Sequence, residues 1–365
     1  MRRDPTAVKL TIFGMALLTV CSLGSGEAAA QRREIAITSY QTTPVTELAI
    51  YTSLPIYLKY YEAEGLNVTF KGAAGGTDSI QQLISGSAQI DFVGSFALIT
   101  VRSKGVPIKA FYRSIKGSVC YPAVLADSPI TDIRQFKGKV IGVNSLGSGC
   151  IPLMKAMMAE MGMNPDKDVN IVVAGVGAQA LAAIRTGKVD VLGLWDAAYW
   201  EMEALGAYRF RKITTPLLET LSWANTGSAL EEFIRANPDV IVGVGRAVAK
   251  ATLFALTNPE ASVRIHWLVY PTTKPTGVDE ATALTRQAEV LRRRIESLRI
   301  DVRNLKEHAT TEPREAEAMY KFLSSSGMVG KPLTSADLYT NEFIGRIFEF
   351  DAEGIVRQAK GFKLD

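Results

Sequence analysis

The stretch LNVTFKGAAGGTDSIQQLISGSAQIDFV, residues 66–93, carries the pattern that decides the fold. Alternating apolar residues predict a strand over residues 66–71, and a glycine-rich turn separates it from a helix that begins at Ser79. A second strand follows over residues 90–93. A strand, a helix and a further strand in this order are typical of parallel sheets, which bind their ligands at the carboxyl ends of the strands.

The same order of elements occurs on both sides of this stretch. A strand at 34–39 and a helical run at 45–62, broken near Pro55, precede it, while strands at 107–113 and 123–126 are expected to continue the sheet. The pattern then restarts, with strands at 139–143, 170–173 and 189–194 and helices at 152–161 and 178–186. Two units in tandem predict an α/β protein of two lobes, each a mainly parallel sheet flanked by helices, with a ligand cleft between them.

The C-terminal part is predicted to be mainly helical from about residue 228. The expected helices cover residues 230–236, 240–257, 261–270, 280–305, 312–324 and 335–347. We expect these helices to cover the first lobe.

Composition points to a globular protein that binds a small solute. The 365 residues are 47% hydrophobic and 21% charged, which favours two or three folded domains over disorder. Forty-one Lys and Arg residues stand against 37 Asp and Glu, a net charge of +4. This balance does not indicate a nucleic-acid or membrane surface, so we expect a small-molecule partner.

The first thirty residues have the features of a secretory signal. Arg2 and Arg3 give a basic start, residues 10–20 are apolar, and Ala28-Ala29-Ala30 form a small-residue cleavage site. We therefore expect export to the periplasm with cleavage near Ala30. Cys120 and Cys150 then remain, and in an oxidising compartment they form either a disulfide or two separate buried thiols.

Three strand-to-helix turns are rich in glycine and small hydroxyl residues. They are Gly75-Gly76-Thr77, residues 145–149 and Gly175-Val176-Gly177. Free backbone N–H groups at the start of the following helix favour an anionic or strongly accepting ligand group. Together the turns predict a site for a small oxyanion or a polar heterocycle.

Further candidates follow predicted strands or lie near the expected crossover between lobes. Tyr40, Ser95 and Trp195-Asp196 each follow a strand, and Arg113 is the one cation we expect as an anion partner. The basic run Arg292-Arg293-Arg294 alternates with glutamates and is interpreted as a solvated helix face.

An enzymatic alternative stays open at this point. Gly175-Val176-Gly177-Ala178-Gln179-Ala180 fits a dinucleotide-binding fingerprint, with Asp196 as the ribose-binding acid. Against it, the two histidines, His266 and His308, lie in helices far from the glycine turns, and the sequence has no nucleophile elbow, Walker A motif or spaced metal-ligand set. We expect no cofactor and no catalytic residue.

Five segments carry a resemblance to a known family. They are LPIYLKYYEAEGLNVTF (54–70), GGTDSIQQLISGSAQIDFVG (75–94), DSPITDIRQFKGKVIGV (127–143), LMKAMMAEMGMNPDKDVNIV (153–172) and AAIRTGKVDVLGLWDAAYWEMEALG (182–206). In this order they resemble the nitrate/sulfonate/taurine-type solute-binding proteins of ABC transporters, including binders of thiamine-pyrimidine precursors. The resemblance covers about residues 35–350.

The resemblance implies a type II periplasmic binding protein that closes on its solute and delivers it to a membrane permease with a separate ATPase. It implies a first lobe of residues 31–118 and 223–365, a second lobe of 119–222, hinge closure, and a monomer. With Arg113 added, the implied ligand-binding residues are Tyr40, Thr42, Gly76, Thr77, Ser95, Ser145, Gly147, Ser148, Gly177, Trp195 and Asp196. Relatives that synthesise the thiamine pyrimidine use a cysteine-rich iron site, and Cys120 and Cys150 alone do not supply one.

Overall fold

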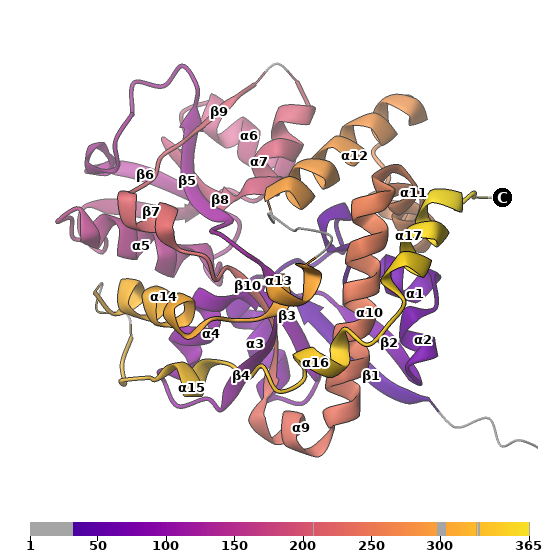
Figure 1. Cartoon of the computed structure of the whole chain (residues 1–365). Helices are drawn as coiled ribbons and strands as arrows, with labels where there is room; N and C mark the ends of the chain where they lie inside the picture. The colour runs from indigo at the N-terminus through magenta and orange to yellow at the C-terminus, as the bar shows by residue number, and fades with distance from the viewer. Residues whose placement is uncertain (1–31, 207, 298–303, 326, 328, 365) are drawn as a thin grey trace, which may run out of the picture. The chain divides into compact units, whose positions relative to one another are not determined.

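The structure is a computed structural model that describes residues 32–364 except 207, 298–303, 326 and 328 (Figure 1). The predicted signal over residues 1–30 lies outside the described residues. The described chain contains two five-stranded sheets.

The first sheet has the strand order β2-β1-β3-β10-β4. Its strands are β1 (Arg33–Ser39), β2 (Leu66–Lys71), β3 (Ile90–Gly94), β4 (Ile108–Ile115) and β10 (Asn225–Leu230). β1 is parallel to β2 and β3, whereas β10 is antiparallel to β3 and β4.

The second sheet repeats this plan with the order β7-β6-β8-β5-β9. Its strands are β5 (Cys120–Leu125), β6 (Lys139–Val143), β7 (Val169–Val173), β8 (Val191–Trp195) and β9 (Phe210–Lys212). β6 is parallel to β7 and β8, and β5 is antiparallel to β8 and β9.

Two sequence expectations are corrected here. The segment predicted to continue the first sheet at 123–126 belongs to β5 of the second sheet. Residues 225–230, placed at a crossover and the start of a helical region, form β10 between β3 and β4 of the first sheet. Both strands are antiparallel to their neighbours, and the βαβ pattern used for the prediction recognises only parallel ones.

The helices before β10 are short, and the two longest helices of the described chain, α10 and α12, follow it. The N-terminal helices are η1 (Thr46–Leu48), α1 (Ser53–Tyr57), α2 (Tyr60–Ala63), α3 (Gly76–Ile84), α4 (Ser95–Arg102), η2 (Ile133–Phe136), α5 (Cys150–Glu160), α6 (Gly177–Arg185), α7 (Asp196–Ala204) and α8 (Pro216–Thr220). The C-terminal helices are α9 (Glu231–Ala236), α10 (Pro238–Thr257), α11 (Pro259–Val269), η3 (Pro271–Thr273), α12 (Glu280–Ser297), α13 (Leu305–Ala309), α14 (Pro313–Ser325), α15 (Ser335–Leu338), α16 (Ile344–Ile347) and α17 (Ala352–Gly361).

Helix α10 is a core helix. It is long and apolar enough to cross a membrane by composition, but 78% of its most apolar window is buried inside the protein. Its neighbours are α1, α2, α11, α16 and α17 (Figure 1). The apolar length of α10 is therefore explained by the core.

The C-terminal helices contact elements beside both sheets, which corrects the expectation that they cover one lobe. α12 packs against α11 and η1 and also against α7, which follows the last parallel strand of the second sheet. α14 packs against both α4 and α5. Figure 1 shows α12 beside α7 and α14 beside α4 and α5. Movement of one sheet against the other would have to rearrange these helix contacts.

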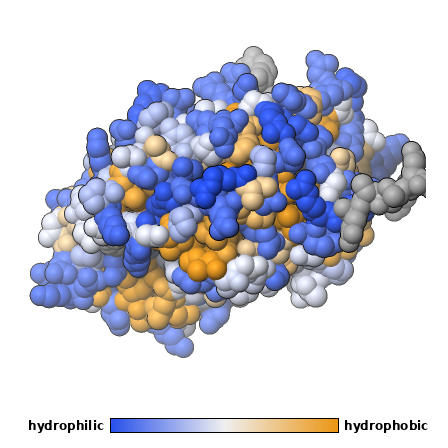
Figure 2. Space-filling model, turned by 90° about the horizontal axis from the view of Figure 1, so that it is seen from below, coloured by the Kyte–Doolittle hydropathy of each residue, from blue (hydrophilic) through white to orange (hydrophobic). Residues whose placement is uncertain are grey.

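The surface seen in Figure 2 mixes hydrophilic and hydrophobic residues, with orange areas divided by blue side chains. Leu146 is the most exposed large hydrophobic residue of the described chain, at 70%. It lies in the turn after β6, one of the turns singled out from the sequence.

Candidate functional site

One pocket lies where the ends of strands from both sheets meet. Its lining consists of Tyr40, Gly75, Gly76, Gly94, Phe96, Val119, Cys120, Asn144, Ser148, Gly149, Cys150, Trp195 and Asn225. Tyr40 and Asn144 directly follow β1 and β6, while Gly94 and Trp195 end β3 and β8. The cavity measures about 30 Å³, which is room for one or two water molecules, so the walls must part to admit an organic solute.

Four helices begin at this pocket. Gly75, Gly94, Gly149 and Trp195 are the N-cap residues of α3, α4, α5 and α7, and all four line the cavity. Three of these N-cap residues are glycines and the fourth is a tryptophan, so no N-cap side chain accepts a hydrogen bond from the helix backbone. Since the N-terminus of each helix carries partial positive charge, the four together favour an anionic or electron-rich ligand group.

The segments that cross between the sheets hold two of these helix starts in place. The Ser95 backbone N–H donates to the Ala224 carbonyl at 2.6 Å, and the Ser95 hydroxyl donates to the Trp223 carbonyl. The Asp196 backbone N–H donates to the Val119 carbonyl at 3.0 Å. The starts of α4 and α7 are thus tied to the chain crossings beside the pocket.

The two predicted glycine turns after β2 and β6 touch each other. The Thr77 backbone N–H donates to the Gly147 carbonyl at 3.4 Å, and the Ser145 hydroxyl donates to the Ala74 carbonyl. A Cβ at Gly75, where φ is +122°, would lie 2.5 Å from the Gly147 oxygen. Only glycine fits this close approach, so Gly147, Ser145 and Thr77 join the two sides of the cleft instead of lining the cavity.

Two buried polar atoms in the pocket wall have no hydrogen-bond partner within the described chain. They are the Trp195 Nε1–H donor and the Asn144 Oδ1 acceptor. Trp195 is only 6% exposed, and its ring meets the ring of Tyr40 edge to face. Buried polar groups are rarely left unpaired, so a bound solute is a natural partner for both.

Cys120 and Cys150 form a disulfide with a Cα–Cα distance of 5.4 Å. It connects β5 to the first residue of α5, and both cysteines line the pocket. Of the two alternatives left open by the sequence, the structure has the disulfide. The bond ties the N-terminus of α5 to the sheet beneath it.

A buried ion-pair cluster lies beside the pocket. The Tyr40 hydroxyl donates to Glu47 Oε1 at 3.1 Å, while Arg294 pairs with Glu47 Oε2 at 2.5 Å and with Asp196 Oδ1 at 2.8 Å. Burial, followed by the charge of Glu47, holds the pKa of Tyr40 well above its usual value, so its hydroxyl stays a donor. Asp196 is therefore held in an ion pair, and this changes its predicted role from a ligand contact to a member of the cluster.

The interpretation of residues 292–294 as a solvated helix face is wrong for Arg294, which is 3% exposed. Its neighbour Arg293 is partly exposed and pairs with Glu203 at 3.0 Å. Arg294 stands three residues after Leu291 and just before Ile295, both buried. It therefore belongs to the apolar stripe of α12, which the charge pattern of the run concealed.

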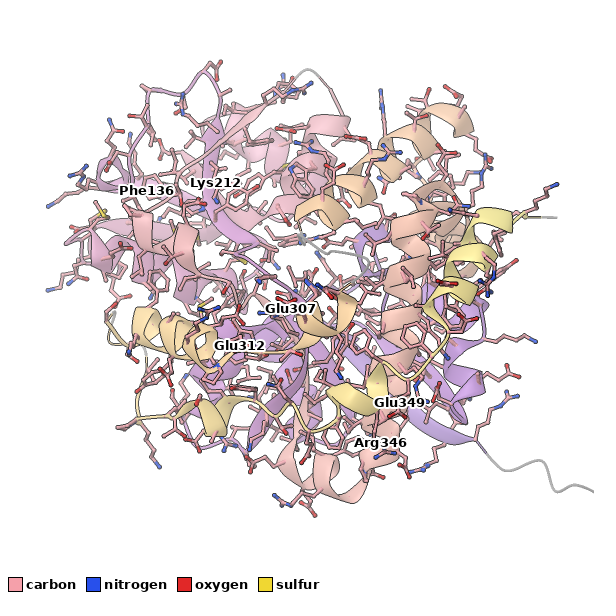
Figure 3. All side chains as sticks on the ribbon, viewed as in Figure 1. Phe136, Lys212, Glu307, Glu312, Arg346 and Glu349 are labelled. Carbon is pink, nitrogen blue, oxygen red and sulfur yellow. A yellow bond between two sulfur atoms is a disulfide. The ribbon has the colours of Figure 1, made fainter. Side chains whose placement is uncertain are left out.

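Arg113 does not lie at the pocket. Its guanidinium pairs with Glu315 and donates to the carbonyl oxygens of His308, at 2.7 Å, and Glu307, at 3.1 Å. Figure 3 labels Glu307 and Glu312, which border this contact region between α13 and α14. These partners engage the guanidinium of Arg113, which the sequence analysis had assigned to an anionic ligand.

The remaining predicted residues divide into two groups. Gly76 and Ser148 line the cavity with Tyr40 and Trp195, and the Ser148 Oγ accepts from the Cys150 backbone N–H at 3.3 Å. Thr42 is exposed, Ser95 is engaged with the crossing segment, and Gly177 begins α6; none of these three lines the cavity. The dinucleotide fingerprint of residues 175–180 is thus outside this pocket.

Sequence reasoning did not select Asn144 or Asn225 for the site. Asn144 directly follows β6, just as Tyr40 directly follows β1. This equivalent position could have identified Asn144 from the sequence. Asn225 starts β10, which the sequence did not predict as a strand. Among the described residues, no group of three or more His, Cys, Asp or Glu side chains is placed to hold a metal ion.

Residues 55–262 match the family described as NMT1/THI5 like. The chain belongs to this family. Among curated proteins, 4-amino-5-hydroxymethyl-2-methylpyrimidine phosphate synthase from Schizosaccharomyces pombe is 25% identical over 239 residues, which are 61% of this chain and 65% of the synthase. The chain thus spans less than two thirds of that relative's length.

Two solved structures with a similar fold are those of solute-binding proteins. The alkanesulfonate-binding protein SsuA from Xanthomonas axonopodis pv. citri, solved bound to MOPS, has a TM-score of 0.61 at 16% identity and covers 86% of this chain and 99% of its own. The periplasmic nitrate-binding protein NrtA from Synechocystis PCC 6803 has a TM-score of 0.62 at 11% identity and covers 92% of this chain and 99% of its own. The predicted family resemblance and the predicted α/β periplasmic-binding-protein fold are confirmed.

Proposed function

We propose that this NMT1/THI5-like protein is the exported solute-binding receptor of an ABC importer. It captures a small polar or anionic organic solute in the pocket between the sheets and delivers it to a membrane permease that works with a separate ATPase. The observation that carries the proposal is the convergence of four helix N-termini, two from each sheet, on one pocket.

The chemistry of the pocket suits recognition better than catalysis. Backbone donors, an indole N–H and an amide surround an otherwise apolar lining of Phe96, Val119 and the disulfide. Such a lining buries the body of a solute and orients one polar group through a few fixed contacts. Sulfonate, nitrate, pyrimidine and carboxylate solutes all present acceptors that fit these donors.

Binding is proposed to proceed by hinge closure. The lobes are residues 31–118 with 223–365, and residues 119–222, and the two crossings between them carry Val119 and Ala224. Because the cavity measures about 30 Å³ with the turns of Gly75 and Gly147 in contact, the structure resembles a closed state. The solute would enter an open state and shift the population towards closure.

A thermal-shift screen followed by calorimetry tests the proposal. The purified protein is mixed with short alkanesulfonates, nitrate, pyrimidines, small carboxylates and nicotinamide cofactors. A solute that binds the native state raises the melting temperature. A shift with one solute class, lost in Trp195→Ala, supports the receptor. A shift with a nicotinamide cofactor alone would support a cofactor-dependent oxidoreductase.

The similarity to the pyrimidine phosphate synthase supports one alternative, an enzyme that makes the same product. Formation of 4-amino-5-hydroxymethyl-2-methylpyrimidine phosphate is therefore assayed with the same wild-type preparation and with the Trp195→Ala variant. Product formation that depends on Trp195 would show that the pocket belongs to an enzyme and not to a receptor.

N-terminal sequencing of the exported protein tests cleavage near Ala30.

A further inference from the structure

A ring of contacts connects Arg294 to both aromatic walls of the pocket. Arg294 pairs with Glu47, which accepts from the Tyr40 hydroxyl, and Tyr40 meets Trp195 edge to face at 5.6 Å. Asp196, the second partner of Arg294, is the residue after Trp195. The ring therefore starts and ends at Arg294 and passes through Tyr40 and Trp195.

The members of this ring come from three separate regions. Glu47 belongs to η1, which follows β1 of the first sheet, and Asp196 begins α7, which follows β8 of the second. Arg294 lies on α12, which packs against both η1 and α7. All three charged side chains are at most 5% exposed, so water screens their charges weakly.

The charges of Glu47 and Asp196 oppose the field of the helix N-termini. Asp196 is the first residue of α7 and its Oδ1 accepts from the Ala197 backbone N–H at 2.7 Å, so its carboxylate lies where that helix would attract an anion. Burial lowers the pKa of Arg294, but Asp196 and Glu47 raise it by more, so the guanidinium stays charged. The charged guanidinium of Arg294 thus forms ion pairs with both carboxylates.

We propose that Arg294 is a positioning and specificity-determining residue that makes the pocket prefer anionic solutes. Its single positive charge offsets one of the two negative charges of Glu47 and Asp196, which leaves less charge to oppose the helix N-termini, and it holds Tyr40 against Trp195. Arg294 does so through Glu47 and Asp196, without contacting the solute. This inference rests on the proposed solute-binding function.

Matched pairs of probes that differ only in charge test this inference. Ethanesulfonate is compared with ethanesulfonamide, and benzoate with benzamide, by calorimetry on the wild type and on Arg294→Gln. We expect the wild type to prefer the anion, and Arg294→Gln to lose about tenfold or more in affinity for the anion while its affinity for the amide changes by less than about threefold. Arg293→Gln, a neighbouring change on the same helix, is the control and should keep the preference.

A triple variant separates charge from shape and guards against misfolding. Glu47→Gln/Asp196→Asn/Arg294→Met removes all three charges at similar volume, so no buried charge is left without its partner. We expect it to bind the anion at least as tightly as the wild type, because the two opposing carboxylates are gone together with the one cation that faces them. Loss of anion affinity equal to that of Arg294→Gln would overturn the charge-offset role.

The outcomes distinguish this inference from the function on which it rests. If the wild type binds no member of either pair, and none of the broader screen, the proposed receptor function fails. If the wild type binds and Arg294→Gln keeps the same ratio of anion to amide affinity, the receptor stands and the role of Arg294 is refuted.

Discussion

The rings of Tyr40 and Trp195 meet edge to face at a centroid distance of 5.6 Å, with an interplanar angle of 68°. Tyr40 follows the first strand of one sheet and Trp195 ends a strand of the other. The contact therefore joins the two sheets across the pocket. Edge-to-face aromatic pairs add a modest stabilisation beyond their buried area.

Trp195→Phe should separate the ring contact from the indole donor. Phenylalanine keeps an aromatic ring beside Tyr40 but removes the Nε1–H that has no partner in the described chain. We expect solute affinity to fall by about fivefold to tenfold, the value of one hydrogen bond, with an unchanged melting temperature. Calorimetry measures the affinity. Trp200→Phe, on α7 but outside the pocket lining, is the matched control, and equal affinity of Trp195→Phe and wild type would remove the indole N–H from recognition.

Gly75→Ala should prevent the two turns from closing. The added Cβ would lie 2.5 Å from the Gly147 carbonyl oxygen, and φ at this position is +122°. We expect solute affinity to fall by about tenfold or more, because closure of the cleft is coupled to binding. Small-angle scattering with and without solute checks whether the solute still compacts the protein. Gly86→Ala also has a positive φ, +74°, but no atom within 4 Å of the added Cβ, so it controls for backbone strain. The same loss in both variants would mean that strain, and not the turn contact, causes the effect.

Removal of the Cys120–Cys150 disulfide should cost stability and loosen the pocket. The bond closes a loop with a sequence separation of 30, and we expect its loss to lower the free energy of unfolding by about 2–4 kcal/mol. Denaturation with urea, with and without a reductant, measures this difference. The variant Cys120→Ala/Cys150→Ala should be as unstable as the reduced wild type and should not respond to the reductant. A wild type that is equally stable in both conditions would contradict the prediction.

Asp91 should make the protein less stable as the pH rises. Burial raises the pKa of this carboxyl, against the opposing influence of Ser228, from 3.8 to about 8. The folded state therefore keeps a proton that the unfolded state releases above about pH 4, so stability declines between about pH 4 and pH 8. Asp91→Asn should melt at a temperature higher than the wild type by about 2 °C or more at pH 8, and the difference should shrink towards pH 4.

The control for this variant is Asp127→Asn, which removes a carboxylate at an exposed position. Melting curves of all three proteins across this pH range give the comparison. A constant difference between Asp91→Asn and the wild type at every pH would show that the carboxyl of Asp91 does not titrate in this window.

Local patterns of sequence predicted much of the fold because parallel βαβ units have a local signature. Residues 66–71 and 90–94 alternate or run apolar between glycine turns, and both form strands where expected. The antiparallel strand of residues 225–230 was missed, because it pairs with β3 and β4, far away in the chain, and its own residues, NTGSAL, have no strong strand pattern. Its position depends on the rest of the sheet.

The site was predictable where a side chain directly follows a strand. Tyr40 and Trp195 were selected in this way and line the cavity, and Asn144 could have been selected by the same rule. The partners of Arg294 could not be identified from the sequence, since Glu47 is 247 positions away and no local pattern specifies that pair. The stripe of α12 that contains Leu291 and Ile295 could have indicated that Arg294 is buried, but not which carboxylates it contacts.

The sequence by itself determined the strand-turn-helix units and the glycine turns, whereas the pairing of Cys120 with Cys150 is seen only in the tertiary structure. Tertiary structure decided which turns meet at the pocket. The turns of Gly76 and Gly177 look alike in sequence and follow the edge strands β2 and β7, yet only Gly76 lines the cavity. The physical reason is that local backbone preferences act over a few residues, whereas strand order and the burial of Arg294 depend on contacts between segments far apart in the chain.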